Sequence, residues 1–105
     1  MTTASTRYYD REGKPLELFA WASLFEDIPY KRIAKDVLPD GTEVSTVWLG
    51  LDHNFGFGGP PLIFETMVFA ATEDGSLGDE LATERYATEE QAKAGHEAMV
   101  REWTK

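Results

Sequence analysis

The sequence contains no cysteine, and this single absence removes several kinds of chemistry. Disulfide bonds, thiolate nucleophiles and thiolate metal ligands are all excluded. Long apolar runs are missing as well: no stretch approaches the roughly 20 apolar residues that span a bilayer, and residues 1–10 contain no apolar segment of the kind found in leader peptides. We therefore expect a cytoplasmic protein with no membrane contact.

Basic residues are few. The chain has 10 Lys and Arg residues against 19 Asp and Glu residues, which gives a formal net charge of −9. Nucleic-acid binding through phosphate neutralisation needs clustered Lys and Arg, so we expect no direct binding of nucleic acid. Between residues 71 and 90, seven acids accompany a single basic residue, Arg85, for a local charge of −6. The seven acids are Glu73, Asp74, Asp79, Glu80, Glu84, Glu89 and Glu90.

The composition is that of a folded protein. Apolar residues make up 42% of the 105 residues, and the aromatic residues comprise six Phe, four Tyr and three Trp. Burial of these side chains offsets the conformational entropy that folding costs without help from metals or disulfides. The length suits one hydrophobic core, so we expect residues 1–105 to form a single domain.

Two segments have the pattern of amphipathic helices. The first begins with Pro15 in its first turn and ends at Pro29. Its apolar positions, spaced i, i+3, i+4, i+7, are Leu18, Trp21, Ala22 and Phe25. The second begins at a capping box formed by Thr88 and Gln91. Its stripe comprises Ala92, Gly95, His96, Met99, Val100 and Trp103.

Between the helices, loose alternation and turn residues predict strands at residues 30–38, 43–51, 62–70 and 83–87, and residues 7–9 could add an edge strand. The turn Pro39-Asp40-Gly41 should join the first two of the four as a hairpin. The expected fold class is α+β: an antiparallel sheet of about four to five strands with an N-terminal and a C-terminal helix packed on it.

The two central strands, residues 43–51 and 62–70, carry apolar side chains on both faces. One face of the first strand includes Val44 and Trp48, and the other includes Val47 and Leu49. A sheet that is apolar on both faces needs cover on both. Either the two helices lie on opposite faces, or a second copy of the protein covers one face, and the second arrangement predicts a homodimer.

The runs VSTVWLGLDHNFGFGGPPLIFETMVF (residues 44–69) and RYATEEQAKAGHEAMV (residues 85–100) resemble a family of small uncharacterised proteins of tailed bacteriophages and prophage-carrying bacteria. The similarity extends to YYDREGKPL and LFED near the N-terminus. The fuller glycine loop is a departure from the family pattern, as is Glu17 where a helix-capping Ser or Thr would be expected. The family has no established activity, so the resemblance implies a phage or prophage setting and no mechanism.

The loop after residue 51 is the first candidate site, because Asp52 and His53 stand at a strand end beside a glycine-rich segment. They suit a general acid/base pair or two metal ligands. Alternatively, Asp52 bonds the turn backbone while Phe55 and Phe57 clamp the loop onto the core. The loop lacks the Lys and Ser/Thr of a phosphate-binding loop.

His53 and His96, with Asp52 or Glu65, would form a zinc or iron site of two imidazoles and a carboxylate. The sequence spacing does not require these residues to meet. The alternative is structural: His96 donates a hydrogen bond to a strand, and Glu65 pairs with Arg85 or Lys31 across strands. None of the four serines has the context of a hydrolase nucleophile.

These observations favour a non-enzymatic phage or prophage accessory protein that acts by binding, either to itself or to a host or virion protein, and no cofactor is expected. The predicted binding surface combines the aromatic loop residues with the acidic stretch: Phe55, Phe57, Asp74, Asp79 and Glu80. A further interpretation of the stretch is a DNA mimic whose carboxylates occupy a basic groove of a host enzyme. The alternative function is a small metal-binding protein or metal-dependent enzyme using zinc or iron.

Overall fold

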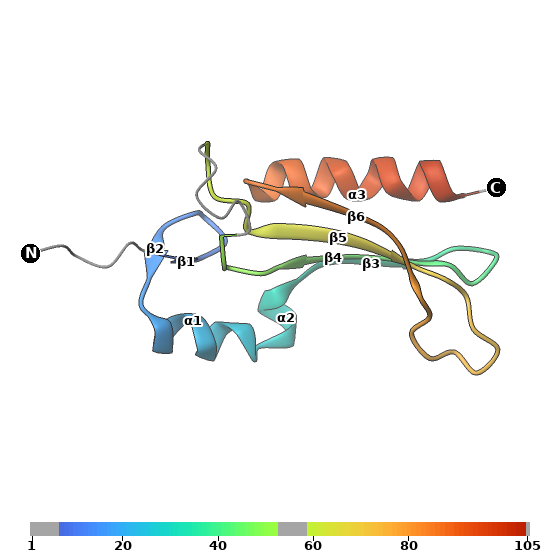
Figure 1. The fold of residues 1–105 in the computed structure, drawn as a ribbon, viewed down its shortest axis with the longest axis horizontal. Helices are drawn as coiled ribbons and strands as arrows, with labels where there is room; N and C mark the ends of the chain where they lie inside the picture. Colours follow the sequence, from blue (N-terminus) through green and yellow to red (C-terminus); the bar gives the residue numbers. More distant parts are fainter. Residues whose placement is uncertain (1–6, 53–58, 105) are drawn as a thin grey trace, which may run out of the picture.

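The computed structural model describes residues 7–52 and 59–104 (Figure 1). It is an α+β structure with a four-stranded antiparallel sheet in the order β3-β4-β5-β6, a separate two-stranded sheet and a C-terminal helix. The elements are β1 (Tyr8–Tyr9), β2 (Pro15–Leu16), α1 (Leu18–Phe25), α2 (Ile28–Lys31), β3 (Arg32–Val37), β4 (Glu43–Trp48), β5 (Phe64–Phe69), β6 (Glu80–Tyr86) and α3 (Glu89–Trp103). Over the described ranges, no helix is both long and apolar enough to cross a membrane.

The C-terminal helix forms where the sequence predicts it. The Thr88 hydroxyl accepts a hydrogen bond from the Gln91 backbone N–H at 3.1 Å, while the Gln91 side chain accepts one from the Ala87 N–H at 3.1 Å. Glu89 and Glu90 occupy the first turn, where negative charge stabilises the helix dipole. Because its apolar stripe faces the sheet, α3 buries Ala92 and His96 against the strands.

The sheet is a simple meander whose register follows from its pattern of apolar residues. In β4, alternate residues Val44, Thr46 and Trp48 are fully buried and face α3. The hairpin between β3 and β4 turns at Gly41, which has a φ of 92° and donates its backbone N–H to the Leu38 carbonyl at 2.8 Å. The antiparallel sheet and the C-terminal helix of the predicted fold are thus confirmed.

Two apolar clusters lie along the face that α3 covers. One contains Trp48, Ile63, Phe64 and Ala92, with Tyr9, Leu16, Trp21, Leu24, Phe25, Tyr30, Ile33 and Tyr86 packed against them. The other contains Leu38, Val44 and Val68, with Ala82, Met99, Val100 and Trp103 packed against them. Thr46 and Thr66 are buried at the strand positions between these clusters, so a polar layer separates two apolar ones.

The N-terminal helix differs from the prediction in its bounds and its place. Pro15 does not open the helix, because Tyr9 pairs with it and draws it into β2. The helix begins at Leu18 and ends at Phe25, and Pro29 lies inside the separate helix α2, which Asp27 caps by accepting the Tyr30 N–H at 3.2 Å. Proline is favourable in the first turn of a helix. Pro29 therefore lies in the first turn of α2 and is not the residue that ends α1.

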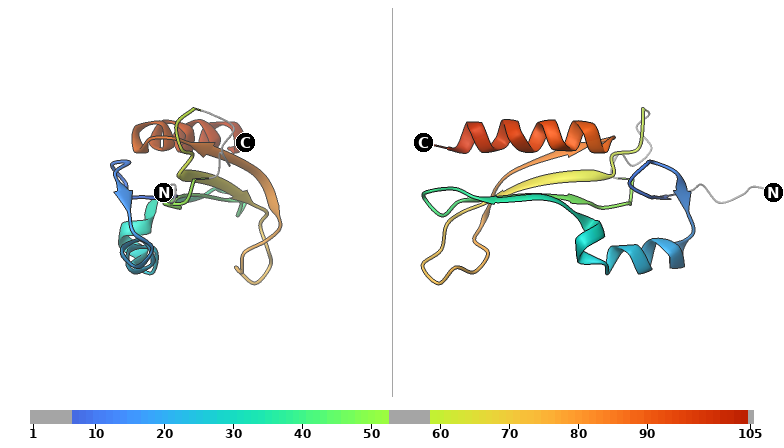
Figure 2. Two further views of the ribbon diagram at one scale, coloured as in Figure 1. Left: turned by 60° about the vertical axis from the view of Figure 1, so that its left-hand side comes forward. Right: turned by 180° about the vertical axis from the view of Figure 1, so that it is seen from behind.

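The helix α1 packs at one end of the sheet. The Trp21 indole N–H donates to the Leu49 carbonyl at 2.9 Å, and the Trp21 ring stacks at 4.8 Å on Tyr8 and at 4.9 Å on Phe25. In Figure 1, α1 and α2 lie below one end of the sheet while α3 lies above it, and both views in Figure 2 agree. The long face of the sheet that points away from α3 is therefore not covered by α1.

Candidate binding surfaces

The sheet surface that points away from α3, here called the open face, is set by the strand register. Because side chains alternate along a strand, the residues opposite the buried set share this face. Its members are Arg32, Lys35, Val37, Glu43, Ser45, Val47, Glu65, Met67, Phe69, Glu80, Thr83 and Arg85. Neither apolar cluster of the core includes Val47, Met67 or Phe69. Val37 is 64% exposed, whereas Val47, Met67 and Phe69 are partly buried.

The charges on the open face cancel. Arg32, Lys35 and Arg85 stand against Glu43, Glu65 and Glu80, which sums to zero, whereas the whole chain carries −9. The Arg85 guanidinium bonds the Glu65 carboxylate at 3.0 Å, and Lys35 lies 3.8 Å from Glu43. Pairing with Arg85 explains how Glu65 can be only 7% exposed on an otherwise apolar strand.

Two hollows flank the open face. A hollow of about 170 Å³ lies between the β3–β4 hairpin and the β5–β6 loop, lined by Val37, Glu43, Phe69, Leu77 and neighbouring backbone. A shallower one of about 530 Å³ follows β6 and is lined by Leu62, Met67, Glu80, Thr83, Glu84 and Arg85. Figure 2 shows the β5–β6 loop bending to the side opposite α3, so this loop borders one end of the open face.

A second apolar surface, here called the ridge, is made by α1 and α2. Its apolar members are Leu18, Phe19 and Ile28, which are 49%, 85% and 52% exposed. Glu17, Glu26 and Asp27 lie beside them and are exposed, and Lys31, the last residue of α2, is the basic residue of these two helices. Sequence reasoning missed the ridge because it assigned α1 one apolar face, although LFAWASLF is apolar around most of its circumference.

A buried polar row crosses the sheet beneath α3. His96, only 4% exposed, places its Nδ1 2.7 Å from the Thr46 hydroxyl and its Nε2 2.7 Å from an Asp36 carboxylate oxygen. The Thr46 hydroxyl also bonds the Thr66 hydroxyl, so β3, β4 and β5 are tied to α3 through one histidine. The prediction that His96 bonds strand groups is confirmed. Asp36, His96 and Thr46 are hydrogen-bonded one to the next, as the three members of a hydrolase catalytic triad are. Because Thr46 is fully buried, a substrate cannot reach its hydroxyl.

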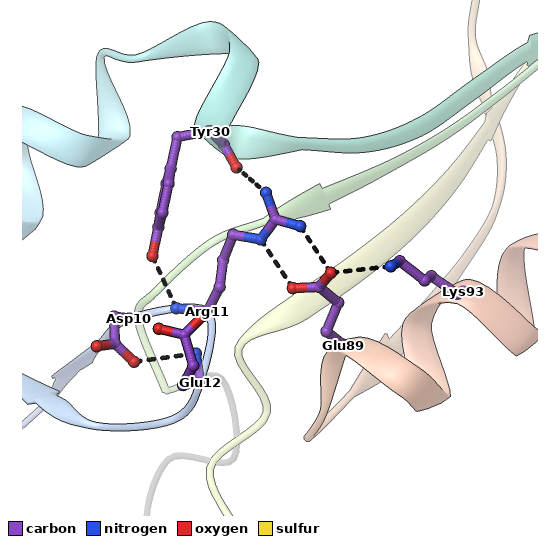
Figure 3. A network of polar contacts seen from close by, with 6 residues as sticks. All are labelled: Asp10, Arg11, Glu12, Tyr30, Glu89 and Lys93. Atoms are coloured by element: carbon purple, nitrogen blue, oxygen red, sulfur yellow. Dashed lines mark hydrogen bonds and ion pairs between the residues drawn. The ribbon is translucent and has the colours of Figure 1, made fainter.

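Arg11 joins three elements in a polar network (Figure 3). Its guanidinium makes two parallel hydrogen bonds to the Glu89 carboxylate, at 2.8 and 2.6 Å, and a third to the Tyr30 carbonyl at 3.0 Å. Lys93 adds an ion pair to Glu89 at 3.1 Å. Hydrogen bonding to Arg11, aided by Lys93, lowers the pKa of Glu89 from 4.5 to about 2. This pair could not be predicted from local sequence patterns, because 78 residues separate its members.

The predicted metal ligands do not converge within the described ranges. Glu65 points to the open face and His96 lies on the α3 side, so one ion cannot bind both. The Asp52 carboxylate accepts the Leu62 backbone N–H at 3.1 Å, as the turn-bonding interpretation predicts. His53, Phe55 and Phe57 lie outside the described residues. Among the residues that are described, no group of three His, Asp or Glu side chains is placed to hold a metal.

The acidic residues predicted to form a binding surface lie in or next to the β5–β6 loop. Asp74, Asp79 and Glu80 are all exposed. The Asp74 carboxylate accepts bonds from the Ser76 N–H at 3.0 Å and the Ser76 hydroxyl at 2.6 Å, and these bonds lower its pKa. Asp74 therefore has a structural role in the turn, and the DNA-mimic interpretation stays a prediction.

Comparison with protein-family models, with curated proteins and with solved structures finds no match to this chain.

Proposed function

We propose that the protein acts by protein–protein binding through the open face of its sheet, as an accessory protein of a phage or prophage. The observation that carries the proposal is a sheet face with no net charge whose apolar side chains, Val37, Val47, Met67 and Phe69, lie outside both core clusters. The phage or prophage setting is supported by the sequence resemblance alone.

The energetics favour such a role. Complete burial of a Val, Met or Phe side chain is worth about 1.5–3 kcal/mol, and the open face offers Val37 on β3, Val47 on β4, and Met67 and Phe69 on β5. Its ion pairs are already formed within the chain, so a partner does not have to desolvate unmatched charges at Glu65 or Arg85. Apolar surfaces framed by polar residues mark interaction sites in soluble proteins.

The arrangement gives less support to catalysis. In the one Asp–His–hydroxyl arrangement within the described ranges, His96 and Thr46 are buried under α3 and the threonine has no exposed surface, while Asp36 is exposed. Buried networks of this kind hold elements together and fix a unique packing. Binding through a surface is therefore the function that these residues support best.

Light scattering on the purified full-length chain tests the proposal. A homodimer would have a mass of 2 × 11.8 = 23.6 kDa. We expect a concentration-dependent rise toward this mass, and we expect Met67→Glu to abolish it because the new carboxylate stands in the centre of the open face. Ala94→Glu makes the same charge change on the exposed side of α3 and should leave the mass unchanged.

A host or virion partner is the other outcome that supports the proposal. In that case the chain stays near 12 kDa, and a bait of the full-length protein retains a defined protein that Met67→Glu loses and Ala94→Glu keeps. A monomer whose captured proteins are identical for both variants would overturn binding at the open face.

A further inference from the structure

The chain presents two apolar surfaces without a partner among the described residues, and they differ in form. The ridge is a pair of short helices with Phe19 at its most exposed point. The open face is a strand surface bordered by the β5–β6 loop. Helix-on-sheet packing is one of the standard ways in which two such surfaces bury each other.

We propose that the open face of one copy receives the ridge of a second copy, and that the exchange is reciprocal about a two-fold axis. This inference rests on the proposed function and names the occupant of the open face. A two-fold interface places residue i against residue j and residue j against residue i, so each dimer contains two identical ridge-on-face contacts.

The dimensions agree. The eight residues of α1 form a helix about 12 Å long and about 10 Å wide. The six-residue strands β4 and β5 extend about 20 Å and lie about 4.8 Å apart, so one helix spans the two central strands. A single contact of this size is small beside the roughly 1,600 Å² of a standard interface, and the reciprocal arrangement doubles it.

The charges select this pairing over others. Glu17, Glu26 and Asp27, with Lys31 at the end of α2, give the ridge a net charge of −2, so packing ridge against ridge would bring like charges together. On the open face, the β3 edge supplies Arg32 and Lys35, and within the described ranges Arg32 makes no ion pair. Packing of the ridge of one copy on the open face of the other therefore brings the ridge carboxylates toward Arg32 and Lys35. It also brings the apolar side chains of the two surfaces together.

A chain cannot make this contact with itself. Trp21 fixes α1 to the Leu49 carbonyl at the end of the sheet, and its stacking on Tyr8 and Phe25 holds the helix there. Figure 1 shows α1 and α2 below one end of the sheet, where the inner side chains of α1 pack toward Trp48 and its exposed side chains point away from this cluster. The ridge thus extends toward the space that a second sheet, facing the first, would occupy.

Because the natural chain lacks cysteine, single introduced cysteines can map the contact in the full-length protein. Phe19→Cys and Met67→Cys chains are mixed and treated with a short bismaleimide. We expect the cross-linked dimer to be several-fold more abundant in the mixture than with either variant alone. Ala94→Cys mixed with Phe19→Cys is the matched control and should give only the background level.

Sedimentation equilibrium supplies the second measurement. Phe19→Ser, at an 85% exposed position, and Met67→Glu should each raise the dimer dissociation constant at least tenfold. A mixture of the two variants should associate more tightly than either alone, because their heterodimer keeps one intact contact of the two. If Met67→Glu loses its circular dichroism spectrum, Val37→Glu replaces it at a more exposed position of the same face.

The outcomes separate the two proposals. A chain that stays monomeric at all concentrations overturns the reciprocal dimer and leaves only a partner of another kind for the open face. A dimer that Met67→Glu dissociates but Phe19→Ser does not, with no cross-link in the mixture, overturns the ridge as occupant and keeps self-association through the open face.

Discussion

At the scale of single residues, His96 is a buried polar side chain that is only 4% exposed. Both ring nitrogens have partners, Thr46 on β4 and Asp36 on β3, and the Thr46 hydroxyl continues the row to Thr66. A buried polar group is costly when its partner is lost, whereas removal of both partners together can be nearly neutral. The row should therefore behave as one unit when it is mutated.

His96→Leu is expected to lower the free energy of unfolding by about 2 kcal/mol, because it leaves the Thr46 hydroxyl with fewer partners in an apolar layer. The double change His96→Leu with Thr46→Val should cost less than the sum of the two single changes. Urea denaturation measures all three variants. Glu97→Gln, on the exposed side of the same helix, is the control, and additive costs would contradict a coupled row.

At the scale of elements, the Arg11 network joins the β1–β2 hairpin, α2 and α3, which no sheet ladder connects. The folded chain holds the pKa of Glu89 at about 2, below its ordinary 4.5. A group with a depressed pKa adds stability above its unfolded pKa and loses that contribution as the pH falls through the folded value. The contribution is thus complete above about pH 4.5 and disappears toward pH 2.

Arg11→Met should therefore be less stable than the natural chain by about 1 kcal/mol at pH 7, a figure suited to a partly exposed, doubly bonded pair. The difference should shrink as the pH falls from 4.5 toward 2, because Glu89 then becomes protonated in both proteins. Thermal unfolding as a function of pH gives the difference directly. Glu12→Gln, beside Arg11 but outside the pair, should show no such convergence.

At the scale of the whole molecule, charge is distributed unevenly. The excess of nine negative charges is absent from the open face and appears on the ridge, on the β5–β6 loop and along β6 and α3. Like charges on a small chain repel one another in the compact state, and salt screens exposed charges over about 8 Å at physiological ionic strength. We therefore expect moderate salt to raise the free energy of unfolding.

We expect the melting temperature to rise by a few degrees when sodium chloride increases from about 10 mM to about 300 mM, since 1 kcal/mol corresponds to roughly 4–8 °C in a domain of this size. Differential scanning calorimetry at fixed, low protein concentration measures the shift. A variant with Glu73 and Asp79 changed to Gln and Asn should show a smaller rise. A melting temperature that falls with salt would mean that attractive ion pairs outweigh the repulsion.

The local features of this fold were determined by the sequence. The turn at Gly41 and the cap of α3 at Thr88 depend on residues within a few positions of one another and occur where the pattern predicts them. The four strands form near their predicted places, but residues 30 and 31, predicted as strand, end the helix α2, and β6 begins at Glu80, three residues before its predicted start. Pro15 and Pro29 were both placed wrongly, and for Pro15 the reason is that proline is acceptable both in a first helical turn and in an edge strand. Only its pairing with Tyr9 placed it in β2.

The tertiary structure decided what depends on distant parts of the chain. Sequence left Arg85 and Lys31 as alternative partners of Glu65; the register brings Arg85 to it, while Lys31 lies 3.5 Å over the Phe25 ring. Sequence also showed that the sheet has two apolar faces but not which one the helices cover. The three-dimensional packing determines which face is covered. The helix α3 packs on one face of the sheet, and Trp21 holds α1 at the end of the sheet, so neither helix covers the other face.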